Sequence, residues 1–375
     1  YWNTTKDLLM AVPVDNTTGY SYQFQNFGKT SNRGIELSVN VDVINKGDFR
    51  FNVGAIYNYN RNKLDELPNA DQYLYSSYWG SSSLVPTNDY MFVEGKAIGL
   101  VRGFISEGYY TVDDFNYTNG QYVLKEGVPD ITKALTATYM HPYDLPAGQT
   151  AFPGAAKFRD VDESGTVDLD DATCLGEVMP RHTGSFQLNF NYKNFDLSTN
   201  FNWTAGGKVY NVAAMINASG QEFDGIGAQR ASWVADAFKV YNVNAAGDLY
   251  AVTNPDELRA LNANAKYHLP YHQSGITSSE WLENGSYLRL QTLTLGYTLP
   301  KNWLTKVHVD KIRLYLTATN LFTITGYSGI DPEVNANPTG QSGFYSDLRI
   351  FPTLNMDFGT YPRARTFTFG ANITF

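Results

Sequence analysis

The sequence contains a single cysteine, Cys174, among 375 residues. One cysteine cannot form a disulfide within the chain, so a secreted scaffold held together by cross-links is excluded. Cationic residues are also few, since 28 Lys and Arg against 37 Asp and Glu leave a formal net charge of −9. This charge argues against nucleic acid as a partner, because sequence-independent binding to phosphates needs a basic face.

Long hydrophobic runs are missing too. Apolar residues make up 43% of the chain, but no run approaches the roughly 18 to 20 consecutive apolar residues that a membrane helix needs. Charged residues are only 17%, whereas aromatic residues reach 15%, and this balance is typical of β architecture and not of a disordered acidic chain. The opening Tyr1-Trp2-Asn3 contains neither an initiator methionine nor a signal peptide, so we expect a fragment of a longer protein.

Apolar and polar residues alternate over stretches of about ten positions, which predicts long strands. Two hairpins are expected, one turning at Asn45-Lys46-Gly47-Asp48 and one at Lys193-Asn194. A phase change near Leu290 indicates a bulge. The strands predicted in this way cover residues 35–43, 49–59, 186–192, 195–203, 287–299, 312–318 and 366–375, with a weaker one at 97–110.

The connections between these strands are of two sizes. Short turns alternate with long excursions, and such asymmetry is rare in soluble sandwiches. One helix is expected in an excursion, where Asn254 can cap the N-terminus, Pro255 suits the first turn and Glu257 can reach back. The long excursions cover residues 62–96, 111–182, 205–286 and 324–364.

The polar face of the predicted strands consists mostly of Asn, Ser, Thr, Gln and Gly, with little Lys or Glu. Ten-residue strands with an apolar outer face and long loops on one side are what a transmembrane β-barrel requires. A large soluble β-sandwich or propeller would show the same alternation. In the soluble protein the face that carries Phe51, Val53 and Ala55 would be buried on a second sheet, whereas in a barrel it would face lipid.

Several phrases resemble, in the same order, those of one family of outer-membrane proteins. These phrases are Lys6-Asp7-Leu8-Leu9, Asn26-Phe27-Gly28-Lys29 with Asn32-Arg33-Gly34-Ile35-Glu36-Leu37, Tyr287-Leu288-Arg289-Leu290 continuing to Pro300, Asn320-Leu321-Phe322-Thr323 with Tyr327-Ser328-Gly329-Ile330-Asp331-Pro332-Glu333, and Tyr361-Pro362-Arg363-Ala364-Arg365-Thr366-Phe367. On these residues the chain resembles the C-terminal part of a SusC/RagA-like TonB-dependent outer-membrane transporter of the Bacteroidetes type.

The resemblance implies an all-β fold, in which residues 1–375 supply about ten strands at the C-terminal end of a 22-stranded transmembrane β-barrel with long extracellular loops. It implies a place in the outer membrane, in contact with lipid, and the import of oligosaccharides or peptides. The implied partners are TonB and a SusD-like lipoprotein, and no enzymatic activity is expected. The N-terminal plug, the TonB box and the other part of the barrel would lie outside this chain, because an isolated half-barrel leaves two unpaired edges in lipid.

Two other classes of protein fit parts of the pattern. A soluble, secreted β-rich protein that binds or cleaves glycans is the main alternative, with a calcium-stabilised loop. A passive porin would also have long loops, but the phrases quoted above fit it poorly.

The segment from Asp160 to Asp171 has the spacing of a calcium-binding loop. Oxygen-bearing side chains stand at positions 1, 3, 5, 9 and 12 of its twelve residues, Gly165 occupies position 6, and position 7 can offer a backbone carbonyl. Hard oxygen donors at this spacing favour Ca²⁺ over zinc. The alternative is a solvated acidic turn without an ion. The predicted ligands are Asp160, Asp162, Ser164, Thr166, Asp168 and Asp171.

Other residues with ligand or catalytic chemistry carry weaker signals. His268 and His272 have the i, i+4 spacing of a metal pair, but Pro270 between them breaks the helix that would align their rings. Cys174 lacks a spaced His or Asn partner, so no catalytic role is predicted. Exposed aromatic residues in the excursions could stack on sugar rings or peptide side chains, or they could pack the loops together. These residues are Tyr78, Trp79, Tyr139, Tyr143, Trp233 and Tyr271.

Strand parity predicts the orientation of the later loops. If Phe375 ends at the periplasmic side, then Lys193-Asn194 and the turn between 300 and 311 are also periplasmic. The excursions 205–286 and 324–364 would then face the outside. Upstream of Thr183 the strand count leaves the side of each loop open.

Overall fold

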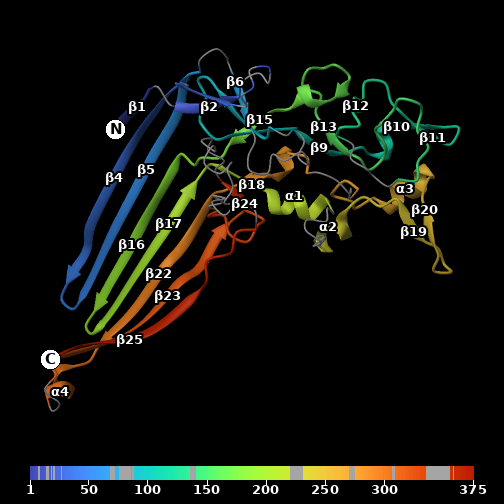
Figure 1. The fold of residues 1–375 in the computed structure, drawn as a ribbon. Helices are drawn as coiled ribbons and strands as arrows, with labels where there is room; N and C mark the ends of the chain where they lie inside the picture. The colour runs from blue at the N-terminus through green and yellow to red at the C-terminus, as the bar shows by residue number, and fades with distance from the viewer. Residues whose placement is uncertain are drawn as a thin grey trace.

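The chain folds into a long sheet and a layer of loops, short strands and helices at one end of that sheet (Figure 1). No described helix is long and apolar enough to cross a bilayer. The computed structural model describes residues 1–6, 9–13, 17, 19, 22–26, 28–67, 72–75, 86, 88–135, 141–219, 231–269, 275–305, 309–334, 355–357 and 359–375.

The long sheet is antiparallel throughout and has eight strands within the described residues. In Figure 1 it forms a curved wall whose strands run side by side along most of their length. In their order across the sheet, the strands are β1 (Trp2–Thr5), β4 (Lys29–Lys46), β5 (Phe49–Glu66), β16 (His182–Tyr192), β17 (Phe195–Ala205), β22 (Tyr287–Thr298), β23 (Lys311–Thr325) and β25 (Thr366–Thr374).

The layer at the end of the sheet contains the remaining strands and most of the helices. Its strands are β2 (Leu9–Pro13), β3 (Tyr22–Asn26), β6 (Gln72–Tyr75), β7 (Tyr90–Val93), β8 (Leu100–Gly103), β9 (Ser106–Tyr109), β10 (Phe115–Thr118), β11 (Gln121–Leu124), β12 (Asp130–Ile131), β13 (Ala156–Phe158), β14 (Thr166–Val167), β15 (Thr173–Glu177), β18 (Lys208–Asn211), β19 (Tyr241–Val243), β20 (Leu249–Ala251), β21 (Leu282–Asn284) and β24 (Met356–Asp357). Its α-helices are α1 (Val212–Ser219), α2 (Ala231–Asp236) and α3 (Pro255–Leu261).

Every strand predicted for the long sheet is present, although the boundaries differ. The first hairpin is longer than the apolar pattern indicated, because β4 and β5 continue to pair through polar residues beyond Ile35 and Tyr59. The weaker strand expected at 97–110 is not part of the sheet. It forms β8 and β9 in the loop layer, and this is one reason why the described part of the sheet has eight strands where about ten were expected.

Direct pairing of β5 with β16 settles the side of the early loops. His182 pairs with Tyr59 and Tyr192 with Phe49, so residues 67–181 form one excursion between neighbouring antiparallel strands. This excursion leaves the sheet at the same end as residues 206–286 and 326–365 (Figure 1). The opposite end carries short turns and α4 (Lys301–Leu304), which lies near the C-terminus.

Local sequence signals explain several of these features. Gly47 and Lys193 adopt positive φ at the two predicted hairpin turns. The bulge expected near Leu290 occurs, since the register shifts between Leu290 and Thr292. Helix α3 begins as predicted, and the Asn254 side chain accepts hydrogen bonds from the backbone amides of Asp256 and Glu257.

Buried apolar side chains lie mainly in the loop layer. One cluster packs Phe104, Tyr110 and Phe158 against residues near α3, and a second cluster packs Tyr90 and Tyr210 next to the upper ends of the long strands. The layer therefore has its own hydrophobic core, to which the wall contributes Leu64 at the upper end of β5.

Candidate functional site

One face of the long sheet is apolar and uncovered. Cross-strand rings stack on it, with centroids 4.3 Å apart for Phe51 and Phe190 and 4.5 Å apart for Phe186 and Phe201. An exposed apolar surface of this extent marks contact with a membrane or a partner. Its members include side chains that are 44% to 73% exposed, namely Ile35, Leu37, Val39, Val41, Leu295, Leu316, Phe367, Phe369 and Ile373.

The uncovered face distinguishes a transmembrane β-barrel from a soluble β-sandwich. Phe51 and Val53 are half-buried and Ala55 is exposed, so within the described part of the chain no second sheet buries them. A soluble sandwich requires that burial. The arrangement is that of a wall whose apolar side faces lipid.

The opposite face of the sheet is lined with amide and hydroxyl groups. Neighbouring strands exchange side-chain hydrogen bonds there: Asn52 Nδ2 donates to Asn40 Oδ1 at 2.7 Å, and Ser198 Oγ donates to Asn189 Oδ1 at 2.7 Å. The hydroxyl oxygens of two threonines further along the row are 3.0 Å apart. The row consists of Asn40, Asn52, Asn189, Ser198, Thr294 and Thr317. This face is polar with few charges, as the lining of a barrel lumen is.

A buried ionic cluster anchors a loop to the lumen face near the loop layer. The Arg289 side chain is 2% exposed and forms ion pairs with Asp331 and, at 3.0 Å, with Glu333. Its Nε donates to Thr323 Oγ1 at 3.0 Å, and Arg363 pairs with the other Glu333 oxygen at 2.6 Å. We call Arg289, Asp331, Glu333 and Arg363 the arginine clamp.

The arginine clamp joins residues from three of the phrases that carry the family resemblance. The sequence placed Arg289 in a strand and Asp331, Glu333 and Arg363 in an excursion, but it offered no signal that they meet. Another residue without a sequence signal is Glu280, where burial raises the pKa of the carboxyl to about 7.

The segment predicted to bind calcium forms a tight acidic turn. Carboxylate oxygens of Asp160, Asp162 and Asp171 all lie within 4.8 Å of one another. The Gly165 amide donates to Asp160 at 2.7 Å, and the Ser164 amide donates to Asp162 at 3.0 Å. Gly165 has φ +88°, as expected for the sharp turn at position 6. Three oxygen-bearing acids therefore converge, which fits a hard cation.

The other three predicted ligands have different local roles. Ser164 Oγ donates to the Thr166 carbonyl at 3.0 Å. The Asp168 carboxylate accepts from the Asp170 amide at 2.8 Å and caps a short 3-10 helix that ends at Asp171. Of the predicted carboxylate ligands, the structure groups Asp160, Asp162 and Asp171, and Asp168 is not in that group.

Three of the remaining candidates lie within the described residues. His268 is buried, its Nδ1 lies 2.9 Å from the Leu269 carbonyl, and burial lowers its pKa to about 4. Cys174 is exposed, and partial desolvation of its sulfur raises the thiol pKa, which disfavours the thiolate. Glu257 does not reach back along α3, since it accepts a hydrogen bond from Tyr250.

Of the aromatic residues considered for ligand stacking, two are described and both are buried. Tyr143 packs with Tyr122 and Phe152, and Trp233 stacks on Tyr267 at 3.8 Å between ring centroids. They pack the loops on one another, which was the second of the two interpretations. His272, Tyr78, Trp79, Tyr139 and Tyr271 lie outside the described residues.

The fold and its two faces define the class of this protein: a section of a membrane-spanning β-barrel wall with long loops at one end. Comparison with known proteins specifies the family, although no family model matches the chain. The chain is 30% identical over 376 residues to the TonB-dependent receptor P3 of Formosa agariphila and 25% identical over 385 residues to the TonB-dependent receptor SusC of Bacteroides thetaiotaomicron. Both matches cover the whole chain but only 32% and 29% of those relatives.

A solved structure of the RagAB peptide transporter has the same fold. It matches the whole chain with a TM-score of 0.64 and 21% sequence identity, over 32% of its own chain. The chain is homologous over its whole length to TonB-dependent receptors, SusC among them, and it corresponds to about a third of the length of these relatives. It is an outer-membrane β-barrel segment, and its relatives are receptors and transporters, not enzymes.

Proposed function

We propose that the chain forms the C-terminal barrel wall and part of the extracellular loop layer of an outer-membrane active importer. The observation that carries this proposal is the match of the whole chain to TonB-dependent receptors. Energy would come from TonB acting on a plug supplied by another part of the protein. A SusD-like lipoprotein would cover the loop layer.

The cargo we propose is an oligosaccharide or a peptide. The lumen-side row from Asn40 to Thr317 presents amide and hydroxyl groups, which suit the hydrogen-bonding groups of both kinds of solute. Few charged side chains interrupt this row, so it does not favour a strongly ionic cargo.

Uptake by cells that carry the full-length receptor and its lipoprotein tests this proposal. We expect uptake of labelled oligosaccharides or peptides that stops when TonB is deleted or the proton gradient is collapsed. Feeding the two labelled mixtures separately identifies the class of cargo. Uptake that continues without TonB would contradict active import and would favour a passive porin.

We also propose that the acidic turn binds Ca²⁺, with Asp160, Asp162 and Asp171 as the carboxylate ligands. The ion would offset the repulsion between these acids and stiffen the loop that precedes β16. Support comes from the convergence of the three carboxylates and from the hard-oxygen donor set.

Removal of two ligands should abolish calcium binding. In the full-length receptor, the double substitution Asp160→Asn and Asp162→Asn is expected to eliminate the calcium signal in titration calorimetry and the calcium-dependent rise in unfolding temperature. At a Ca²⁺ concentration 100 times the dissociation constant that rise corresponds to about 2.7 kcal/mol. The control is Asp170→Asn, an exposed acid of the same segment outside the three-carboxylate group. If both variants bind calcium like the parent, the turn is not a metal site.

A further inference from the structure

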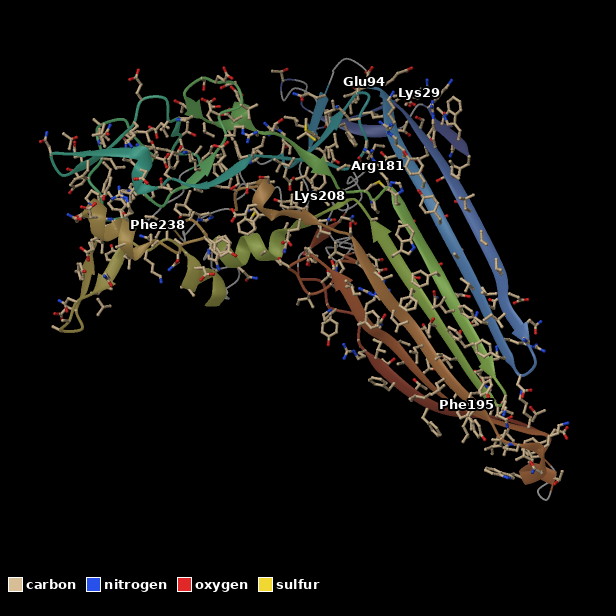
Figure 2. All side chains as sticks on the ribbon, turned by 180° about the vertical axis from the view of Figure 1, so that it is seen from behind. Lys29, Glu94, Arg181, Phe195, Lys208 and Phe238 are labelled. Atoms are coloured by element: carbon tan, nitrogen blue, oxygen red, sulfur yellow. The ribbon has the colours of Figure 1, made fainter. Side chains whose placement is uncertain are left out.

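A cavity at the upper end of the barrel wall has four cationic side chains among its lining residues. It has a volume of about 190 Å³. It lies where the end of β5 meets the turn between β7 and β8 and the segment before β16, and Figure 2 shows the labelled Arg181 at this end, with Phe195 at the opposite one. Its lining includes Arg61, Lys63, Lys96, Arg181 and one carboxylate, that of Glu177.

The charges of this cavity are only partly compensated. Glu177 pairs with Arg181 at 2.7 Å, and Lys63 lies 3.4 Å from Asp65. Within the described residues, Arg61 and Lys96 have no ion pair. A net positive cluster therefore occurs in a chain whose overall charge is −9.

The strand register adds a further cation beside the cavity. Arg33 of β4 stands directly opposite Arg61 of β5. Like charges at opposed positions of an antiparallel pair repel each other. The Arg33 guanidinium is held 4.2 Å from the centroid of the Trp2 ring, which does not neutralise it. An anion between the two strands would relieve this repulsion.

Arg61 and Lys63 lie on the lipid-facing row of β5 and not on its lumen row. The alternation in β5 is unbroken from Phe49 to Leu64, so Arg61 and Lys63 continue the outward row that contains Phe51 and Val53. The residues just below them are aromatic. Tyr59 lies two positions before Arg61 in this row, or about 7 Å along the strand.

The aromatic residues mark the edge of the hydrocarbon region. Tyr57 stacks with His182 and with Trp203, at centroid distances of 6.0 and 6.1 Å. Aromatic girdles of this kind sit at membrane interfaces. Arg61 and Lys63 lie just beyond these aromatic residues, at the end of the sheet that carries the long loops. This position is the depth of the headgroups of the outer leaflet.

We propose that Arg61, Lys96 and their neighbours bind the phosphate group of a lipid in the outer leaflet. A phosphate provides charge and several acceptor oxygens for guanidinium and ammonium donors. The lipid is favoured over a soluble anion because Arg33, Arg61 and Lys63 lie on the outward face, directly beyond the aromatic girdle. The bound headgroup would fix the depth of the barrel and join β4 to β5 at the rim.

Lipid binding to the full-length receptor in detergent tests the proposal. The probes are diphosphoryl lipid A, the same lipid without phosphates, and inorganic phosphate, and bound lipid is counted by native mass spectrometry. The double substitution Arg61→Gln and Lys96→Gln should weaken diphosphoryl lipid A binding roughly 30-fold, since each cation near a membrane surface contributes a factor of about 5.

Two further variants separate charge recognition from folding. Arg61→Lys with Lys96→Arg keeps the charges and should retain most of the binding. Lys133→Gln with Lys239→Gln removes the same charge from exposed sites of the loop layer and should bind like the parent; Figure 2 labels Phe238, the neighbour of Lys239, at the far end of that layer from Arg181.

Three results would overturn the proposal. The first is equal affinity of diphosphoryl lipid A for the parent and for the Arg61 and Lys96 double variant. The second is equal binding of the lipid with and without phosphates, which would show that the phosphate is not recognised. The third is full displacement of the lipid by inorganic phosphate at equal concentration, which would assign the site to a soluble anion.

Discussion

Replacing Arg289 with methionine is expected to lower the free energy of unfolding of the full-length receptor by about 3–5 kcal/mol, because it leaves a buried carboxylate without its cation. The Asp331 side chain is 9% exposed and pairs with Arg289. It can therefore recover its hydration only if its loop moves away from the wall. The segment from residue 326 to residue 334 should open first. Denaturant titration measures the loss, and hydrogen exchange locates it.

The outer end of the arginine clamp provides a matched control. Arg363 also pairs with Glu333, but its side chain is 44% exposed. An exposed ion pair contributes only about 0–1 kcal/mol, so Arg363→Gln should have a small effect. Adding Asp331→Asn to Arg289→Met should recover part of the loss, since no charge then remains buried in that pair. If Arg289→Met costs no more than Arg363→Gln, the clamp does not hold the loop.

The arginine clamp shows what the sequence could not reveal. Arg289 is separated from Asp331 and Glu333 by 42 and 44 residues. Spacing patterns report neighbours on one strand or one helical face, and a contact of this range depends on how a long excursion folds back. The role of Arg289 therefore follows only from the three-dimensional structure.

The barrel wall could be predicted because the alternation in each strand depends only on the surroundings of its own two faces. Outward residues meet lipid and inward residues meet polar solvent, so the period of two is written into each strand separately. The same locality explains the error at residues 97–110, since a short strand in a loop layer alternates just as a wall strand does. Only pairing partners separate the two cases, and β8 pairs with β15 and β7.

The acidic turn could be predicted from the sequence only in part. Its geometry is set within twelve residues, so the sharp turn at Gly165 and the meeting of Asp160 with Asp162 follow from spacing. The same spacing placed Asp168 among the ligands, but a free carboxylate before a short helix is also a good N-cap. Asp168 caps that helix by accepting from the Asp170 amide.

Introducing arginine on the outward face should interfere with insertion into a bilayer. Leu188 lies near the middle of β16, where it pairs with Val53 on one side and Thr199 on the other. Arginine on the lipid side of a barrel near the bilayer midplane costs about 2–4 kcal/mol, because its charge leaves water for hydrocarbon. We expect Leu188→Arg to reduce the stability of the full-length receptor in lipid vesicles by this amount, measured by urea titration.

The neighbouring residue makes the test specific to one face. Gln187 precedes Leu188 in the same strand, points to the lumen side and is exposed. Gln187→Arg adds the same side chain to water and should change stability by less than about 1 kcal/mol, in line with other exposed substitutions. The apolar face would be located in lipid if the stability losses of the two variants differ strongly in vesicles and differ less in detergent micelles, where water reaches the interface. Equal losses for both variants would mean that the two faces share one environment, which a barrel wall does not allow.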